Sequence, residues 1–366
     1  MSIARRSAVV MALTVIAIPT GVADAHHSRP TVRVVHPGQS IQAALNAARP
    51  GDTVVVRRGT YRENVEILTD RITLIGQGAV LEAPEPSTVR SHCPGPAGQN
   101  LYGICVVGEA DLNNGTVVRE IHGVTVRGFT VGRFPSTGIV VFGGNGTRLT
   151  DLDVAGGFDY AILLARSTRS SLTDSQAHGA RTAGLYIGDS PQSRAFVRGN
   201  RMFDNGIFGI FVRDAAHGTI LGNQVEGSCI GLGFVPTRQT PRIVADWYAG
   251  RNRIARNTKL CGTGDPARPL TGMGVFISGS SEEITVAHNR VENNQIAAGS
   301  NAPWGGGVVL VNGAQFGVPA APAHNRIIAN RLSGNLPNDI MVVHDGSDNR
   351  IQANRCATSS PAGLCR

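Results

Sequence analysis

Short apolar runs alternate with polar turn residues along most of this chain, and the alternation recurs with a period. The stretch AFVRGNRMFDNGIFGIFVRDAAH, residues 195–217, shows one complete unit. Asn200 lies in its first turn, and a strand-like run, 209–212, follows before Arg213 and Asp214 interrupt it. Such a period is the signature of a repeat protein whose units stack on one another.

Aligning the repeats places polar or small residues in two columns. The first column consists of Gly128, Asp151, Asp174, Asn200, Asn223, Asn257, Asn289, Asn330 and Asn354. The second consists of Gly138, Ala161, Gly184, Gly209, Gly231, Gly274, Gly307 and Asp339, each followed by an apolar residue. A closed coil that turns at these positions explains both columns. Stacked Asn side chains are expected to hydrogen-bond along the axis, and the glycines to allow corners with positive φ.

Residues 31–82 predict a cap on the first coil. Ser40 is a suitable N-cap for a short helix whose apolar face carries Ile41, Ala44, Leu45 and Ala48. Such a helix would cover the open end of a stacked core, where unpaired strand edges invite aggregation. An irregular loop is expected over 83–120, followed by coils over 123–356.

The segment GDTVVVRRGTYRENVEI, followed by RITLIGQG, is similar to the start of pectin methylesterases and many other right-handed parallel β-helix proteins. Gly59, Tyr61 and Glu63 fit the GxYxE pattern of those esterases. Their later signature motifs, which supply two aspartates and an arginine, have no match here. Tyr61 and Glu63 are therefore predicted to be structural residues that tie the first coil to the cap.

The repeats resemble the β-helix units of pectate lyases and the carbohydrate-binding and sugar-hydrolase module of NosD-like proteins. The resemblance covers residues 31–82 and 123–356. It implies an all-β fold, a single-stranded right-handed parallel β-helix with a short N-terminal capping helix. Leucine-rich repeats are the alternative, but their leucine framework and helix signals are missing. Because one fold hosts many activities, the resemblance is specific for fold rather than for function.

The N-terminus predicts export. Arg5 and Arg6 precede an apolar run over 8–18, and small residues follow at 23–25, as in a secretion signal. Residues 1–25 are therefore expected to be a signal peptide and 26–366 a single secreted domain. No other segment has the length of a membrane span.

Six cysteines in an exported chain indicate disulfides. They fall as neighbours in the sequence: Cys93 with Cys105, Cys229 with Cys261, and Cys356 with Cys365. The sequence alone leaves other pairings open. The spacing pattern CxxC is absent, which argues against a zinc site.

The formal net charge is +8, and arginine supplies nearly all of the positive charge. Guanidinium groups suit planar contacts to carboxylates, sulfates or phosphates, so an acidic polysaccharide or another extracellular ligand is expected as partner. The alternative is a basic surface with no specific partner. No nucleic-acid partner is predicted, a monomer is expected, and no cofactor is evident. The resemblance to β-helix lyases adds calcium as a candidate metal.

Within the strands after the second column, side chains should alternate between core and exterior. The inward row is predicted to be Ile139, Ile162, Leu185, Ile210, Leu232, Val275, Val308 and Ile340. The outward row is then Val140, Leu163, Tyr186, Phe211, Gly233, Phe276, Val309 and Met341, which is apolar for a solvated surface. Either loops cover this row, or it forms the floor of a groove in which Phe211 and Phe276 stack on a ligand.

Longer segments flank the outward row in its C-terminal half, and both tryptophans lie in them. Trp247 and Trp304 are therefore candidates for the two walls of a groove, since binding residues concentrate on long loops. The alternative is that each tryptophan packs only within its own loop.

Charged residues near the strand ends supply candidate chemistry. β-Elimination of a uronate polymer needs a base at C5 and a positive group beside the carboxylate. Arg213 is predicted as base or clamp, Tyr186 as proton donor and Arg181 as neutralising group, with His178 nearby. Hydrolysis would instead need paired carboxylates, for which Asp189 and Asp214, one coil apart, are the candidates. These four charged and phenolic groups, Arg213, Asp214, Tyr186 and Asp189, form the predicted catalytic set.

Two further hypotheses involve no polysaccharide turnover. The protein could be a non-catalytic polysaccharide-binding or surface scaffold protein. It could also hold a flat hydrophobic small molecule on Tyr186, Phe211 and Phe276.

Overall fold

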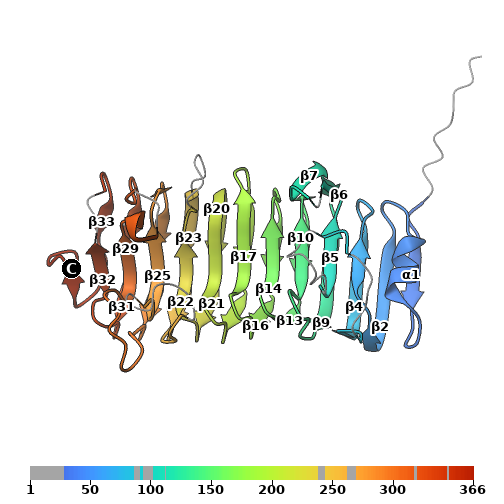
Figure 1. The fold of residues 1–366 in the computed structure, drawn as a ribbon, viewed down its shortest axis with the longest axis horizontal. Helices are drawn as coiled ribbons and strands as arrows, with labels where there is room; N and C mark the ends of the chain where they lie inside the picture. Colours follow the sequence, from blue (N-terminus) through green and yellow to red (C-terminus); the bar gives the residue numbers. More distant parts are fainter. Residues whose placement is uncertain are drawn as a thin grey trace, which may run out of the picture.

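The computed structural model describes residues 29–85, 91–93, 102–111, 113–237, 244–261, 269–316, 320–343 and 346–366. The described chain winds into a long stack of coils, in which successive strands lie side by side along the long axis (Figure 1). Each strand of the stack pairs in parallel with its equivalents in the neighbouring coils. The predicted parallel β-helix is confirmed. The expected signal peptide lies outside the described residues.

Each coil contributes strands to three faces. Face 1 consists of β3 (Val65–Ile67), β5 (Ile104–Val107), β10 (Ile139–Phe142), β14 (Tyr160–Ala165), β17 (Ala183–Ser190), the first part of β20 (Phe208–Leu221), β22 (Ile230–Phe234), β25 (Met273–Ser278), β29 (Gly306–Val311), β32 (Ile340–Val343) and β34 (Ser359–Ser360). Face 2 consists of β1 (Val32–Val35), the first parts of β2 (Thr53–Arg62), β4 (Thr73–Glu82) and β9 (Thr125–Val131), β12 (Arg148–Thr150), β15 (Ser171–Thr173), β18 (Ala195–Arg198), the second part of β20, β23 (Val244–Gly250), β27 (Thr285–Ala287), β30 (Arg326–Ile328) and β33 (Arg350–Gln352). Face 3 consists of the second parts of β2, β4 and β9, β13 (Asp153–Ala155), β16 (Gln176–His178), β19 (Arg201–Phe203), β21 (Gln224–Glu226), β24 (Arg253–Ala255), β28 (Arg290–Glu292) and β31 (Arg331–Ser333).

A few short elements lie outside these faces. β6 (Glu109–Asp111) and β7 (Thr116–Arg119) form an antiparallel hairpin, and β8 (Ile121–His122) pairs with β11 (Gly144–Asn145). β26 (Ser281–Glu282) pairs in parallel with the start of β23, and a 3-10 helix spans Gly313–Phe316. The predicted loop over 83–120 is corrected in part, because β5 within it joins face 1 between β3 and β10.

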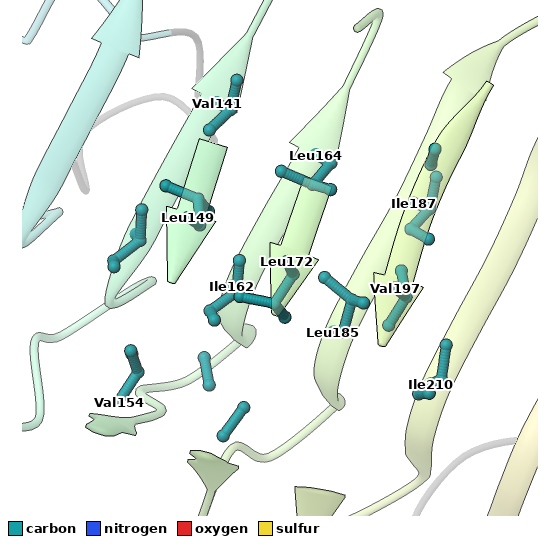
Figure 2. Packing of buried hydrophobic residues seen from close by; sticks show 14 of the residues in the cluster. Val141, Leu149, Val154, Ile162, Leu164, Leu172, Leu185, Ile187, Val197 and Ile210 are labelled. Atoms are coloured by element: carbon teal, nitrogen blue, oxygen red, sulfur yellow. The ribbon is translucent and has the colours of Figure 1, made fainter. Parts of the chain in front are cut away.

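The core runs through the inside of the coils. All eight residues of the predicted inward row have at most 1% of their surface exposed and belong to one apolar cluster. Leu149, Leu172 and Val197 of face 2 meet Ile162 and Leu185 of face 1 inside the coil (Figure 2). Because each coil buries its apolar residues against the next, the whole stack shares one core.

A short helix lies at the position of the predicted cap. Helix α1 (Ile41–Asn46) begins at Ser40, whose hydroxyl accepts a hydrogen bond from the Ala43 amide, and Ile41 and Leu45 are buried. The Glu63 carboxylate accepts bonds from the Ile41 and Gln42 amides and the Ser40 hydroxyl. The Tyr61 hydroxyl donates to the Arg57 carbonyl oxygen at 2.8 Å. Tyr61 and Glu63 are therefore structural, as the missing esterase motifs predicted.

Buried asparagines form hydrogen-bonded ladders at the corners of the coils, and the main ladder lies between faces 2 and 3. The main ladder runs through Asn200, Asn223, Asn252, Asn289, Asn330 and Asn354. The predicted column is wrong at two places. Asn252 replaces Asn257, which lies in a second ladder with Asn294 and Asn335. Gly128, Asp151 and Asp174 align with Gly199, one residue before Asn200, because Thr173 pairs with Arg198.

The second column is confirmed in register, but the reason for its glycines differs from the prediction. Gly209 does not have a positive φ. A Cβ there would overlap the Val225 side chain and lie 2.8 Å from the Gly231 carbonyl oxygen. Glycine is needed at Gly209 because Val225 and the next coil approach too closely for a side chain at this position.

Three disulfides join the neighbouring cysteines, Cys93 to Cys105, Cys229 to Cys261 and Cys356 to Cys365. The first anchors 91–93 on β5, and the second ties the segment after β24 to the start of β22. The described part of the chain has no free cysteine.

Replacement of Asn289 by alanine tests the ladder. The Asn289 side chain accepts bonds from the Asn252 amide and donates to the Ala249 carbonyl oxygen, and both partners are buried. Each of the two orphaned groups costs about 1–3 kcal/mol, so Asn289→Ala should lower the free energy of unfolding by about 2–6 kcal/mol. Urea unfolding monitored by circular dichroism gives this value, with exposed Gln352→Ala as the control. Equal stability of the two variants would contradict the role of the ladder.

Candidate functional site

The predicted outward row of face 1 is confirmed in register. Val140, Leu163, Tyr186 and Phe211 stand opposite one another on successive coils, and Gly233, Phe276, Val309 and Met341 continue the row. The row belongs to a second apolar cluster, separate from the core.

Loops cover the C-terminal half of this row, so the predicted groove is wrong there. Phe276 is 1% exposed and Val309 is fully buried. Trp304, which was predicted as a groove wall, is 6% exposed and belongs to the same apolar cluster. The physical reason is that the free energy of the folded protein falls when a loop removes contiguous apolar surface from water. Phe276 and Trp304 are thus parts of a packed satellite core.

Trp247 does not stand beside Trp304. It lies in β23 on face 2, 1% exposed in the main core, and its Nε1 donates to the Ala215 carbonyl oxygen at 2.9 Å. Its ring extends over Gly218 of the preceding coil. The long segment before it was interpreted as a loop, whereas its end is a regular strand. The two tryptophans therefore do not flank one cleft.

Aromatic rings fill the middle of the outward row. The Tyr186 ring lies 4.7 Å from that of Tyr160 and 5.4 Å from that of Phe211, measured between centroids. Phe208 stacks on Phe211 at 4.1 Å and covers Gly233, which has no side chain. Phe211 is 9% exposed. Because these rings pack on one another, Tyr186, Phe211 and Phe276 offer no open surface for a flat hydrophobic ligand. The structure therefore disfavours that hypothesis.

Polar groups gather at the edge of this aromatic cluster. The Tyr186 hydroxyl occupies the space over Gly188, and Gly188 pairs with Arg213 on the next coil. The backbones of Gly188 and Arg213 are one strand spacing apart, about 4.8 Å, so the hydroxyl lies over the strand position next to Arg213. Asp189 follows Gly188, and the side chain of Arg213 is 43% exposed. Tyr160, Tyr186, Asp189 and Arg213 are called the tyrosine–arginine cluster below.

Burial shapes the acidity of the two tyrosines. Desolvation, followed by the charge of Asp159, raises the pKa of Tyr160 to about 12, and Arg213 opposes this. Desolvation also raises the pKa of Tyr186 well above its ordinary value, with Asp189 as the next cause, while Arg213 again opposes the shift. Both hydroxyls stay protonated at neutral pH, so each is a proton donor rather than a base.

Asp214 has a different role from the one predicted. Its carboxylate accepts bonds from the Thr237 amide at 2.8 Å and the Thr237 hydroxyl at 2.6 Å, and the residue is 4% exposed. It therefore anchors the segment after β22. Asp189 and Asp214 are neighbours in register, as predicted, because Ser190 pairs with Ala215. The buried, bonded state of Asp214 nevertheless disfavours the two-carboxylate hydrolase.

Arg181 and His178 lie away from the cluster. Arg181 precedes β17, at the opposite end of the strand from Gly188, and its guanidinium carbon lies 4.3 Å from the Phe158 ring centroid. It lines a shallow hollow of about 510 Å³ with Arg133. His178 lies on face 3, where it pairs with Asp153 at 3.1 Å. Neither is placed to neutralise a substrate group held by Arg213.

Calcium was a candidate metal from the sequence. In the described ranges, no group of three or more His, Cys, Asp and Glu residues is arranged to hold a metal ion. Likewise, no helix among the described residues is long and apolar enough to cross a membrane.

A family model described as a right-handed beta helix region matches residues 137–355. The chain belongs to the right-handed beta helix family. Among curated proteins, no sequence matches it. The β-helix family membership agrees with the resemblance to pectate-lyase-like repeats.

Solved structures with the same fold are distant in sequence. A pectate lyase shares 12% identity, with 88% of this chain and 79% of that chain covered and a TM-score of 0.53. The A-module of a mannuronan C-5 epimerase from Azotobacter vinelandii shares 18% identity, with 87% and 92% covered and a TM-score of 0.56. DFA-IIIase from Arthrobacter chlorophenolicus without its lid shares 12% identity, with 88% and 94% covered and a TM-score of 0.57. At this identity the likeness establishes the fold of this β-helix protein alone.

Sequence reasoning missed Tyr160. The equivalent positions on the next coils hold the apolar residues Ala183, Phe208 and Ile230. A polar phenol in this apolar column was the sequence feature that could have identified Tyr160 as a site residue.

A shallow groove of about 370 Å³ on face 2 was also missed. It is lined in part by His217 and Asp246, whose Nδ1 and Oδ2 atoms lie 2.7 Å apart. The same turn column holds His324 and Asp348 at 3.4 Å, and all four have positive φ. The pairing therefore recurs as a feature of this turn, and both side chains of the first pair are exposed to water.

The raised tyrosine pKa values predict alkaline destabilisation of this β-helix protein. An unfolded tyrosine ionises near 10.0, whereas Tyr160 in the fold ionises near 12. The folded state therefore retains a proton that the unfolded state loses, so stability is complete below pH 10 and falls as the pH rises toward 12. Melting temperatures across this range should fall less steeply in Tyr160→Phe than in the wild type. Parallel curves for the two proteins would contradict the assignment.

Proposed function

We propose that the protein cleaves an acidic polysaccharide by β-elimination at the tyrosine–arginine cluster, outside the cell. The observation that carries the proposal is the protonated Tyr186 hydroxyl over Gly188, beside the half-exposed Arg213. The substrate class is supported by fold neighbours named as a pectate lyase and a mannuronan C-5 epimerase. Three disulfides support an oxidising location.

Arg213 is the clamp in this proposal. Its guanidinium would pair with the C5 carboxylate of a uronate residue, which stabilises the negative charge that develops when the C5 proton leaves. Arg181, at the other end of the strand, does not share this task. Tyr160, the more exposed of the two tyrosines, would pack its ring against the sugar.

The proton transfers use the remaining two groups. The Asp189 carboxylate takes the C5 proton, and the electron pair of that C–H bond forms the C4–C5 double bond. The C4–O bond breaks as the Tyr186 hydroxyl donates its proton to the leaving oxygen. The proton on Asp189 then returns to Tyr186 through solvent, so the enzyme is restored and one chain becomes two, one of them unsaturated.

Removal of the Tyr186 hydroxyl tests the proposal. With pectate, alginate and glycosaminoglycans as substrates, the wild type should form an unsaturated product that is followed by ultraviolet absorbance. Tyr186→Phe should lower kcat by about 10²–10⁴-fold, the usual contribution of a positioned general acid. Arg213→Gln should lower kcat/KM, since it removes the carboxylate clamp.

Matched controls separate chemistry from folding. Tyr248→Phe on face 2 and Arg148→Gln, an exposed arginine on the same face, make the same chemical changes away from the cluster and should retain full activity. If the C5 hydrogen exchanges with deuterated solvent and no unsaturated product forms, the result would indicate an epimerase instead of a lyase. A wild-type protein inert on every uronate polymer, with and without calcium, would refute the proposal.

A non-catalytic polysaccharide-binding protein is the second candidate. The observation that favours it is the burial of Tyr186, which is only 5% exposed. It predicts retention of a uronate polymer without turnover, unchanged in Tyr186→Phe. Formation of an unsaturated product by the wild type, together with its loss in Tyr186→Phe, would exclude this candidate.

A further inference from the structure

Arginines follow the ladder asparagines along this chain. Seven Asn-Arg dipeptides begin at Asn200, Asn252, Asn289, Asn325, Asn330, Asn349 and Asn354. On face 3, Arg253 pairs in register with Arg290, Arg290 with Arg331, and Arg331 with Arg355. Four successive coils therefore present a guanidinium at the same position, about 4.8 Å apart in strand spacing. These four residues are called the arginine ladder.

The asparagines hold this spacing rigid. The asparagines before the four ladder arginines are buried and bonded from coil to coil, for example Asn330 to Asn289 and to Asn354, each at 3.0 Å. The arginine comes directly after the buried turn, and the next residue, such as Leu332, points into the core. Each ladder arginine is therefore placed outward from a fixed backbone.

Like charges directly opposite each other in a sheet are unfavourable, and carboxylates on β21 and β28, in the middle of face 3, neutralise them. The Glu226 carboxylate pairs with Arg201 at 2.8 Å and also contacts Arg256. The Glu292 carboxylate pairs with Arg290 and lies 3.6 Å from the Arg253 Nε.

The neutralising carboxylates end before the last coils. The position of Glu292 is taken by Ser333 on the next coil. In the described part of the chain, Arg331 and Arg355 form no ion pair, and both are exposed. Around the corner on face 2, Arg326 pairs in register with Arg350, and both are exposed.

Two acidic residues of the C-terminal coils are already engaged. Asp348, two residues before Arg350, faces His324 at 3.4 Å. Asp339 is buried and accepts a bond from the Ala357 amide at 2.9 Å. Among the described residues, Arg331 and Arg355 thus have no ion-pair partner, whereas the Asp348 carboxylate lines the same hollow as Arg326 and Arg350.

We propose that the arginine ladder, with Arg326 and Arg350 around the corner, binds a linear polysaccharide that carries carboxylates or sulfates, laid along the helix axis. This rests on the proposed function for its substrate class and places a second polymer contact away from the tyrosine–arginine cluster. One guanidinium per coil engages successive anionic groups, and its planar fork matches both carboxylate and sulfate.

The surface disfavours single-stranded nucleic acid. Such ligands are held by aromatic rings on which bases stack. β24, β28 and β31, which carry Arg253, Arg290 and Arg331, contain no aromatic residue. A polysaccharide needs only the charge pattern.

Binding of the full chain to immobilised alginate and heparin tests the ladder, with dextran as the uncharged polymer and single-stranded DNA as the competing polyanion. Arg331→Gln/Arg355→Gln should weaken the affinity for alginate or heparin by about tenfold or more at low salt, since it removes two charge-assisted contacts. The loss should shrink as salt screens the charges. Glu292→Gln, which removes the counter-charge of Arg253 and Arg290, should tighten binding.

The charge-matched control is Arg57→Gln/Arg58→Gln, two exposed arginines on β2 at the other end of the molecule. It should change affinity by less than about twofold. An equal loss in both double variants, or DNA binding as tight as that of the polysaccharides, would overturn the proposal. Tyr186→Phe should bind alginate as the wild type does, so loss of turnover and loss of ladder binding are read separately.

Discussion

The structure depends on hydrogen bonds between buried asparagine side chains and the backbone of the next coil. A sharp corner in each coil leaves buried amides and carbonyls that the strands do not satisfy, and such groups are costly when unpaired. Asn252 illustrates the solution, because its Oδ1 accepts from the Asn223 amide while its Nδ2 donates to the Ile220 carbonyl oxygen. Once these bonds fix the coil spacing, the rows of side chains on all three faces follow in register.

That register separates two kinds of apolar surface. The inward row builds the core, whereas the outward row of face 1 builds a second cluster that is closed by loops in its C-terminal half and by its own rings near Phe211. The polar side chains proposed to act on a substrate, Tyr186, Asp189 and Arg213, lie at the edge of this second cluster. The proposed activity therefore belongs to the middle coils rather than to a walled groove, and the charged surface of the last coils lies on other faces.

Much of the fold could be predicted from the sequence because its signal is local and repeated. Ser40, the inward row and the outward row were all assigned correctly from spacing. Asn257 was misplaced because Asn252 and Asn257 are both ladder residues five positions apart, and an insertion hides which one continues the column. The site was less accessible, since whether a loop covers Phe276 or exposes it depends on tertiary packing. Trp247 shows the same limit, because an aromatic residue in a long insertion can belong to a strand and to the core.

A crystal structure of the protein with a short uronate oligosaccharide tests the central claim most directly. The account predicts a sugar carboxylate paired with the Arg213 guanidinium, with the glycosidic oxygen within hydrogen-bond distance of the Tyr186 hydroxyl. A sugar bound in the face 2 groove beside His217, with Arg213 and Tyr186 untouched, would contradict it.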